Sequence, residues 1–297
     1  MLHQIKYRLL LFGLLFPFFS FSQTLDWWRN LVNWDGTSHW STYLITSPKY
    51  FGPNAFTVPS INTGRVDSLV SIGLTSNFHF SKGDNTQNLM LYGNYTTKSN
   101  SISVDARFVP YERFQLSHAK KEERSVYYKE YYKKETVGDV VVNTTIQLFK
   151  KAGKLNMPAA LRLGVRMPSG SAMGAARYAD MPSYWIDLGT SLSFNNPDWK
   201  WMNMIGFLVW QTNNDDLRQN DAFLFGSGIE WSHGGFRLQA YGAGYLGYLE
   251  NGDSPVVIRL NLEKRKKSVI YIFRLQQGLH DFAYFSAEAG ASFIFNK

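Results

Sequence analysis

From Asp67 onward, the chain alternates between apolar and polar residues in segments that are separated by turn-forming clusters. The first segment, SLVSIGLTSNFHFS, has Ile72 and Phe78 at positions of one parity and Thr75 and His79 at the other. Side chains of a β-strand point alternately to its two faces, so this pattern predicts a strand with one apolar and one polar face. Its repetition along the chain predicts a single large antiparallel sheet.

Each further segment of this kind is close to the ~9–11 residues that a tilted strand needs to cross a bilayer. The segments are residues 87–98, 101–109, 138–150, 158–167, 184–195, 199–211, 221–232, 236–249, 255–264, 268–277 and 282–295. Together with the first, they predict an all-β fold, a transmembrane antiparallel β-barrel of about 12 strands. An even number of strands places both ends of the barrel sequence on the same side.

The connections between these segments differ in length according to their place in the chain. Short links (KSN, KAGKLNM, NPD, HGG and KRKK) occur at every second position, and the intervening links include the two longest, residues 110–137 and 168–183. Outer-membrane barrels have short periplasmic turns and longer outer loops, so this alternation favours a membrane barrel. The second long loop is rich in small residues, and we expect it to fold inward over the barrel mouth.

The two faces of the predicted strands also differ as a membrane barrel requires. Leu163 and Val165 alternate with Arg162 and Arg166, which predicts apolar side chains toward lipid and charge or glycine toward the lumen. Tryptophans near strand ends are expected to form an interfacial girdle, although ordinary packing would explain any single one of them. These tryptophans are Trp185, Trp199, Trp201, Trp210 and Trp231.

The first residues have the pattern of a secretory signal peptide. Lys6 and Arg8 precede an apolar stretch that is too short for a spanning helix, and a small-x-small site favours cleavage before Gln23. We therefore assign residues 1–22 to a leader that directs the chain out of the cytoplasm. A retained anchor helix is the alternative.

Residues 23–66 do not follow the strand pattern. Trp28 and Val32 lie at helical spacing, and three prolines between residues 48 and 59 predict irregular chain. A segment this aromatic is costly to leave in water, so we expect it to enter the barrel mouth as a plug or to lie along the periplasmic face of the membrane. The plug is preferred, and the barrel itself comprises residues 67–297.

The amino-acid composition excludes several kinds of site and partner. The chain has no cysteine, which excludes disulfides, thiolate metal sites and a cysteine nucleophile, and we expect no cofactor. A formal charge of +8 could suggest nucleic acid, but an exported chain with dispersed charges rarely meets it. We expect the surplus lysines and arginines to contact the anionic head groups of outer-membrane lipids and lipopolysaccharide.

The last residues, EAGASFIF, contain Glu288 and Gly290 followed by the aromatics Phe293 and Phe295. This run resembles the C-terminal assembly signal of Gram-negative outer-membrane β-barrels. The resemblance implies an outer-membrane location and recognition of this strand by the barrel assembly machinery. The chain departs from the pattern because two more residues follow Phe295, where many members end.

A second resemblance covers residues 138–171. GDVVVNTTIQLF, followed by PAALRLGVRMPSGS with its turn at Pro168, Ser169 and Gly170, is similar to a stretch of the barrel family named for the meta-pathway of phenol degradation. It implies a channel-like, porin-like barrel associated with the uptake of small, often hydrophobic compounds.

Charged residues on the predicted lumen face are the candidate ligand-binding site. In one interpretation, opposed basic and acidic walls form a constriction that orients and selects a polar solute. In the other, the same side chains pair into a network that fills a narrow barrel and holds it shut. The residues are Arg162, Arg166, Arg237, Arg259, Arg274, Asp105, Asp187, Glu230, Glu263 and Glu288.

Three further sequence patterns do not lead to an assigned site. His79 and Ser81 have a spacing used by barrel lipases, but neither an orienting group nor an oxyanion site is identifiable, so no catalytic residue is assigned. The segment AKKEERSVYYKEYYKKE predicts a short amphipathic helix against lipid phosphates or a partner protein, or simply a solvated loop. Aspartates at 215, 216 and 221 lack the spacing of a calcium loop, so no metal site is assigned.

The sequence thus predicts an outer-membrane channel or uptake protein that passes or binds a small molecule through a charged, plugged lumen. The alternative is a non-conducting structural or assembly subunit of an outer-membrane protein complex. A lipid-modifying barrel enzyme is the third hypothesis. The identity of the solute or partner is not readable from the chain.

Overall fold

The computed structural model describes residues 22–150, 157–213 and 218–295. Its strands form one antiparallel sheet. They are β1 (Val70–Ser81), β2 (Asp84–Thr96), β3 (Ile102–Leu116), β4 (Glu135–Thr136), β5 (Val140–Phe149), β6 (Ala159–Met167), β7 (Ser183–Ser193), β8 (Trp199–Gln211), β9 (Gln219–His233), β10 (Phe236–Gly247), β11 (Val256–Lys266), β12 (Val269–His280) and β13 (Phe285–Phe295).

Twelve of these strands close into a barrel, and the two-residue β4 pairs only with β3. The seam lies between the first and last strands, where Val70 is opposite Phe295 and Phe80 is opposite Phe285. Closure gives each of these twelve strands a partner on both edges, as a sheet in lipid requires because no water is present to bond the backbone. The predicted antiparallel barrel is confirmed.

The main departure from the predicted elements is the length of β3. Alternation predicts a loop from residue 110, but the strand continues to Leu116 because residues 111–116 extend the hairpin with β2. This extension brings Glu112 and Phe114 into the barrel interior, where both side chains are buried.

The outer surface of the barrel is apolar. On β1, Ile72, Leu74 and Phe78 are exposed, whereas Thr75 and Asn77 between them are buried. Such a surface would be unfavourable in water and is the expected surface toward hydrocarbon. The predicted orientation of the strand faces is confirmed.

The tryptophan girdle is only partly present. Trp199 and Trp201 are 39% and 46% exposed on the outer surface, and Trp231 is half-buried. The prediction is wrong for Trp185 and Trp210, which are buried inside the barrel. These two side chains pack in the interior core and not at the membrane interface.

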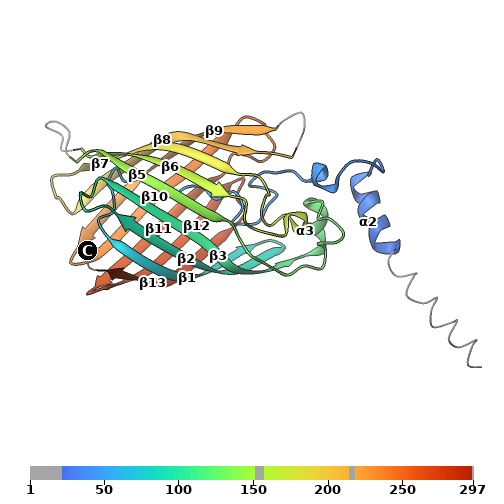
Figure 1. Ribbon diagram of the computed structural model, residues 1–297, viewed down its shortest axis with the longest axis horizontal. Helices are drawn as coiled ribbons and strands as arrows, with labels where there is room; N and C mark the ends of the chain where they lie inside the picture. Colours follow the sequence, from blue (N-terminus) through green and yellow to red (C-terminus); the bar gives the residue numbers. More distant parts are fainter. Residues whose placement is uncertain (1–21, 151–156, 214–217, 296–297) are drawn as a thin grey trace, which may run out of the picture.

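Two ends of the barrel can be distinguished (Figure 1). The turn end carries the short turns, such as residues 97–101 and 234–235, and the C-terminal end of β13. The loop end carries the long connections and α3 (His118–Glu123), which lies between β3 and β4. Two N-terminal helices also lie at the loop end: α2 (Ser22–Val32) and the 3-10 helix η2 (Trp40–Tyr43). In the part of the chain that the structure describes, no helix is both long and apolar enough to cross a membrane.

Residues 44–69, here called the interior segment, run inside the barrel from the loop end to the start of β1. Phe51, Phe56 and Val58 of this segment pack with apolar side chains that β8–β10 direct inward, such as Met204. The lumen was expected to be polar, but one side of it is a hydrophobic core. The sequence of β8, WKWMNMIGFLVW, is indeed apolar on both faces.

Candidate functional site in the barrel lumen

Two of the predicted lumen arginines bind the backbone of the interior segment. Arg259 donates from Nη2 to the Val58 carbonyl at 2.7 Å and from Nη1 to the Pro59 carbonyl at 3.0 Å. Arg162 donates from Nη2 to the Ser60 carbonyl at 2.8 Å. Irregular chain inside a barrel has no ladder to satisfy its carbonyls, and charged donors from the wall supply the missing bonds.

Arg162 also belongs to a buried ion pair. Its Nε lies 2.8 Å from Oδ2 of Asp187, and Asn62 of the interior segment donates to the other carboxylate oxygen at 2.8 Å. Asn62 reaches the wall again through the Ala160 carbonyl at 3.1 Å. The predicted Arg162 and Asp187 therefore lie together, and they act as an anchor for the interior segment.

Arg166 fastens the loop at residues 168–182. It lies 2.5 Å from Asp139 and donates to the Met181 carbonyl at 2.7 Å and to the Ser183 hydroxyl at 2.9 Å. Met181 and Ser183 lie at the C-terminal end of the loop, and Asp139 also accepts from the Gly170 N–H near its start at 2.7 Å, so Arg166 and Asp139 together tie the loop to the barrel wall.

Five of the six remaining predicted charges belong to a belt on the inner wall, which Lys200 joins; the sixth, Asp105, lies outside it and accepts from Asn143 of β5 at 2.8 Å. One residue from each of the consecutive strands β8 to β13 takes part, and the signs alternate, with successive distances of 3.0, 2.8, 3.6, 3.7 and 2.7 Å. Opposite charges on adjacent strands neutralise one another in this way. The members of this charge belt are Lys200, Glu230, Arg237, Glu263, Arg274 and Glu288.

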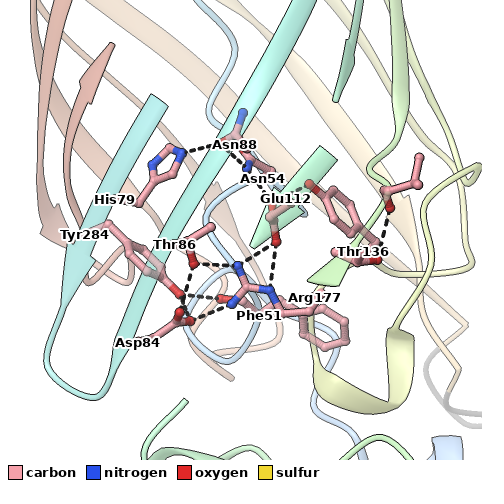
Figure 2. A network of polar contacts seen from close by, with 12 residues as sticks. Phe51, Asn54, His79, Asp84, Thr86, Asn88, Glu112, Thr136, Arg177 and Tyr284 are labelled. Carbon is pink, nitrogen blue, oxygen red and sulfur yellow. Dashed lines mark hydrogen bonds and ion pairs between the residues drawn. The ribbon is translucent and has the colours of Figure 1, made fainter. Parts of the chain in front are cut away.

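A second network closes the loop end of the lumen, and sequence analysis missed it. Arg177, which is 0% exposed, lies between Asp84 at 2.8 Å and Glu112 at 2.7 Å (Figure 2). Arg124, which follows α3, reaches Asp84 at 2.7 Å and the Tyr284 hydroxyl at 2.8 Å. The only sequence signal was an arginine within a loop of small residues, which does not reveal its partners.

A tyrosine beside Arg177 completes this network. The Tyr178 hydroxyl donates to Glu112 at 2.6 Å. Burial, together with the Glu112 carboxylate, raises the pKa of Tyr178 well above its usual range, so the phenol stays protonated and remains a donor. Glu112 also accepts a bond from Asn54 of the interior segment at 2.7 Å, which joins segment, loop and wall.

The loop at residues 168–182 folds inward, as its small residues predicted. Ala175, Ala176 and Tyr178 are buried, and Gly52 of the interior segment donates to the Ala176 carbonyl at 2.8 Å. Ala172 and Ala176 have left-handed backbone conformations, with φ of 64° and 51°. Small side chains let this strained loop approach the segment closely.

A cavity of about 590 Å³ remains between the interior segment and the wall. Its lining extends from Asp67 and Ser71 near the turn end to Asn54 and His79 beside the Arg177 network. The Arg107 side chain of β3 also lines it; Asp105 attracts its charge, but among the described residues this side chain forms no hydrogen bond or close ion pair. Sequence analysis did not single out Arg107, although strand parity places it on the lumen face.

No family model matches the chain, and no curated protein is similar to it in sequence. Among solved structures, it is similar to an outer membrane channel from Pseudomonas putida F1, with a TM-score of 0.56 and 11% identity over 80% of this chain and 100% of that one. It is also similar to the NanC porin, with a TM-score of 0.51 and 9% identity over 75% and 98% of the two chains. The protein is a multi-pass barrel of the outer-membrane type. At these identities, the likeness establishes the fold alone.

The predicted pair of His79 and Ser81 is not formed in this barrel. Nδ1 of His79 lies 2.7 Å from the Ser286 hydroxyl of β13, and Nε2 lies 2.9 Å from Oδ1 of Asn88 on β2. The histidine therefore bridges β2 and β13, the two neighbours of its own strand, and among the described residues its ring forms no hydrogen bond with Ser81.

The outer loop with interleaved lysines and tyrosines contains α3, and it packs on α2 at the barrel mouth. The Trp28 indole donates to the Ser125 carbonyl at 3.3 Å, and Trp27 lies edge-on to Tyr131 with centroids 5.0 Å apart. Contact of this loop with lipid phosphates or a partner stays a prediction. Of the aspartates weighed as calcium ligands, those at 215 and 216 lie outside the described residues, and Asp221 is exposed on β9.

Proposed function

We propose that the protein is an outer-membrane channel for a small polar molecule, with a lumen that the interior segment and the loops hold closed at rest. The observation that carries this proposal is a cavity lined in part by charged and amide side chains, between the wall and the interior segment. The hydrogen bonds that hold the segment run mostly from wall side chains to its backbone carbonyls. Such contacts can be exchanged for water or for a solute without breaking the barrel ladder. The likeness in fold to channel barrels supports it.

The closed state follows from what occupies the loop end. Arg177 and the aromatic side chains of Phe51 and Phe114 are fully buried there, so a solute entering from this end must displace the loop. The cavity lining begins on the other side of this network. Opening therefore requires movement of the loop, of the interior segment, or of both.

Arg107 supports selection of anions. It shares the cavity with Arg259 and Arg274, whereas those two have partners in the wall or in the interior segment. Asp105 attracts the Arg107 guanidinium, but no hydrogen bond or close ion pair among the described residues engages it, and in a confined, poorly screened space it can attract a carboxylate, phosphate or sulfonate group. We infer that the passing solute carries such a group.

Conductance in planar bilayers tests the channel. Replacing both Arg162 and Arg259 by alanine should loosen the interior segment and give larger or more frequent open events than the wild type. The matched control is Arg265→Ala, which removes an exposed arginine near the turn end and should leave conductance unchanged. If the double variant is folded, and both it and the wild type are silent, the structural-subunit hypothesis replaces the channel.

The enzyme hypothesis is the least supported. His79 and Ser286 face the lumen cavity, whereas the acyl chains of outer-membrane lipids lie outside the wall. Backbone N–H groups in the surrounding strands are engaged in the sheet ladder, so they do not offer an oxyanion site. We expect a fluorophosphonate probe to leave Ser286 unlabelled, and labelling that Ser286→Ala abolishes would reverse this conclusion.

A further inference from the structure

We infer that residues 22–43 are displayed on the outer face of the membrane, because the interior segment threads the whole lumen from the loop end to the turn end. An N-terminal segment of a barrel with an even number of strands would ordinarily remain in the periplasm, where the first strand begins. This inference does not depend on whether the lumen conducts.

The chain enters β1 at the turn end. Val70 is opposite Phe295 at the C-terminal end of β13. The Thr96 hydroxyl, at the end of β2 next to the turn at residues 97–101, donates to the Asp67 carbonyl. The residues immediately before the barrel are therefore held at the end with the short turns.

The helices before the interior segment lie at the opposite end of the barrel (Figure 1). Trp40 of η2 stacks on Tyr127 of the outer loop, with centroids 4.9 Å apart and planes inclined by 13°. The Trp28 indole of α2 bonds to Ser125 in the same loop. Aromatic packing of this kind fixes α2 and η2 at the loop end.

Between these ends, contacts of the interior segment progress along the barrel axis in chain order. The contacts nearest the loop end come first: Thr46 accepts from Trp210, close to the loop end of β8, at 3.0 Å. Then Phe56 accepts from Tyr245 on β10, also at 3.0 Å.

Later residues of the segment reach the middle and then the turn end. Val58 and Ser60 contact Arg259 and Arg162 within β11 and β6. Gly64 accepts from Gln147, close to the turn end of β5, at 2.8 Å. A segment that turned back on itself would not give this order, so the chain passes through the lumen once.

The orientation of the barrel then decides the side on which α2 lies. Outer-membrane barrels place short turns in the periplasm and long loops outside. With the turn end in the periplasm, residues 22–43 are outside. The interior segment then offers the periplasm only its C-terminal part, residues 65–69. The predicted leader before Ser22 lies outside the described residues.

Single-cysteine labelling tests this placement because the chain contains no cysteine. Thr37→Cys introduces a thiol at an exposed residue between α2 and η2. Lys129→Cys marks the outer loop and Lys98→Cys the turn between β2 and β3, and both lysines are exposed. Intact cells are treated with a maleimide on a polymer too large for porins, and heat-modifiable gel mobility verifies that each variant is folded.

We expect Thr37→Cys and Lys129→Cys to be labelled on intact cells, and Lys98→Cys only after the outer membrane is permeabilised. If Thr37→Cys requires permeabilisation while Lys129→Cys does not, the segment is a periplasmic lead-in and the inference is overturned. If Lys98→Cys alone is labelled on intact cells, the barrel is inverted and the inference fails equally.

Discussion

At the scale of single residues, the lumen is organised by arginines that have different tasks. Arg259 holds backbone carbonyls, Arg237 balances acids on neighbouring strands, and Arg177 sits between two carboxylates with no exposure at all. Removing one partner of a buried ion pair leaves an uncompensated charge, whereas a surface arginine contributes little. Substitutions of these arginines are therefore expected to have different effects on stability and conductance.

Replacing Arg177 by methionine should destabilise the folded barrel by about 3–5 kcal/mol, because Asp84 and Glu112 would remain buried and lose their shared cation. The measurement is the midpoint and slope of denaturant unfolding in detergent micelles. Arg113→Met is the matched control, since Arg113 adjoins Glu112 on β3 but is exposed. Equal effects of the two substitutions would show that the network does not stabilise the closed mouth.

Arg107→Glu should reduce or reverse the preference for anions in a channel opened by loosening the interior segment. The substitution inverts the charge of a side chain that faces the cavity and that, among the described residues, forms no hydrogen bond or close ion pair. The reversal potential under a salt gradient reports ion preference directly. Arg265→Glu, at an exposed residue near the turn end of β11, serves as the control. An unchanged reversal potential for Arg107→Glu would remove Arg107 from the selectivity site.

At the scale of elements, the interior segment is bound by packing as well as by hydrogen bonds. The Phe56 ring lies edge-on to Phe51 with centroids 5.4 Å apart, and it contacts Trp210 at 5.8 Å. The Arg166 guanidinium lies 5.3 Å from the centre of the same ring. Phe56 therefore packs both on its own segment and on two strands of the wall, β6 and β8.

Phe56→Ala should release the interior segment without unfolding the barrel. Loss of a buried aromatic costs about 3–5 kcal/mol, and here that loss falls on docking of the segment, since the strand ladder does not involve Phe56. We expect more frequent open events and faster proteolysis within residues 44–69. Phe207→Ala is the control because Phe207 is 61% exposed on the lipid face. Identical conductance of the two variants would argue against the segment as the closing element.

At the scale of the whole molecule, stability comes from closure of the sheet. Each of the twelve barrel strands is bonded to two neighbours, and the seam between β1 and β13 is in register over its length. The apolar outer surface, exemplified by Ile205 and Phe293, is exposed in the absence of lipid. The folded protein should accordingly need detergent or a bilayer to remain dispersed.

The closed barrel should migrate differently on a denaturing gel before and after boiling, because a continuous ring of strand pairing resists detergent until heat opens it. Truncation before Phe285, which removes β13, should abolish the unboiled form, since the seam cannot close. A wild-type protein that migrates identically in both conditions, or that stays soluble without detergent, would contradict the barrel.

Particular residues show how far the sequence allowed prediction. Alternation located the barrel strands and the inward direction of Arg162 and Arg166, because strand parity is a local property. It misplaced Trp210, which shares a parity with inward residues of β8 but was assigned to the interface from its position near a strand end. Whether the charged lumen binds a solute stays a prediction.

The sequence by itself determined the strands, their apolar outer faces and the alternation of short and long links, because each follows from a periodicity of two residues and from the solvent on either side of the wall. Only the tertiary structure decided how the lumen is filled. The contacts responsible join distant parts of the chain, such as Arg177 with Asp84 and Arg259 with Val58. No local period encodes them, since they arise from a loop and an irregular segment that gain hydrogen-bond partners only once the barrel surrounds them.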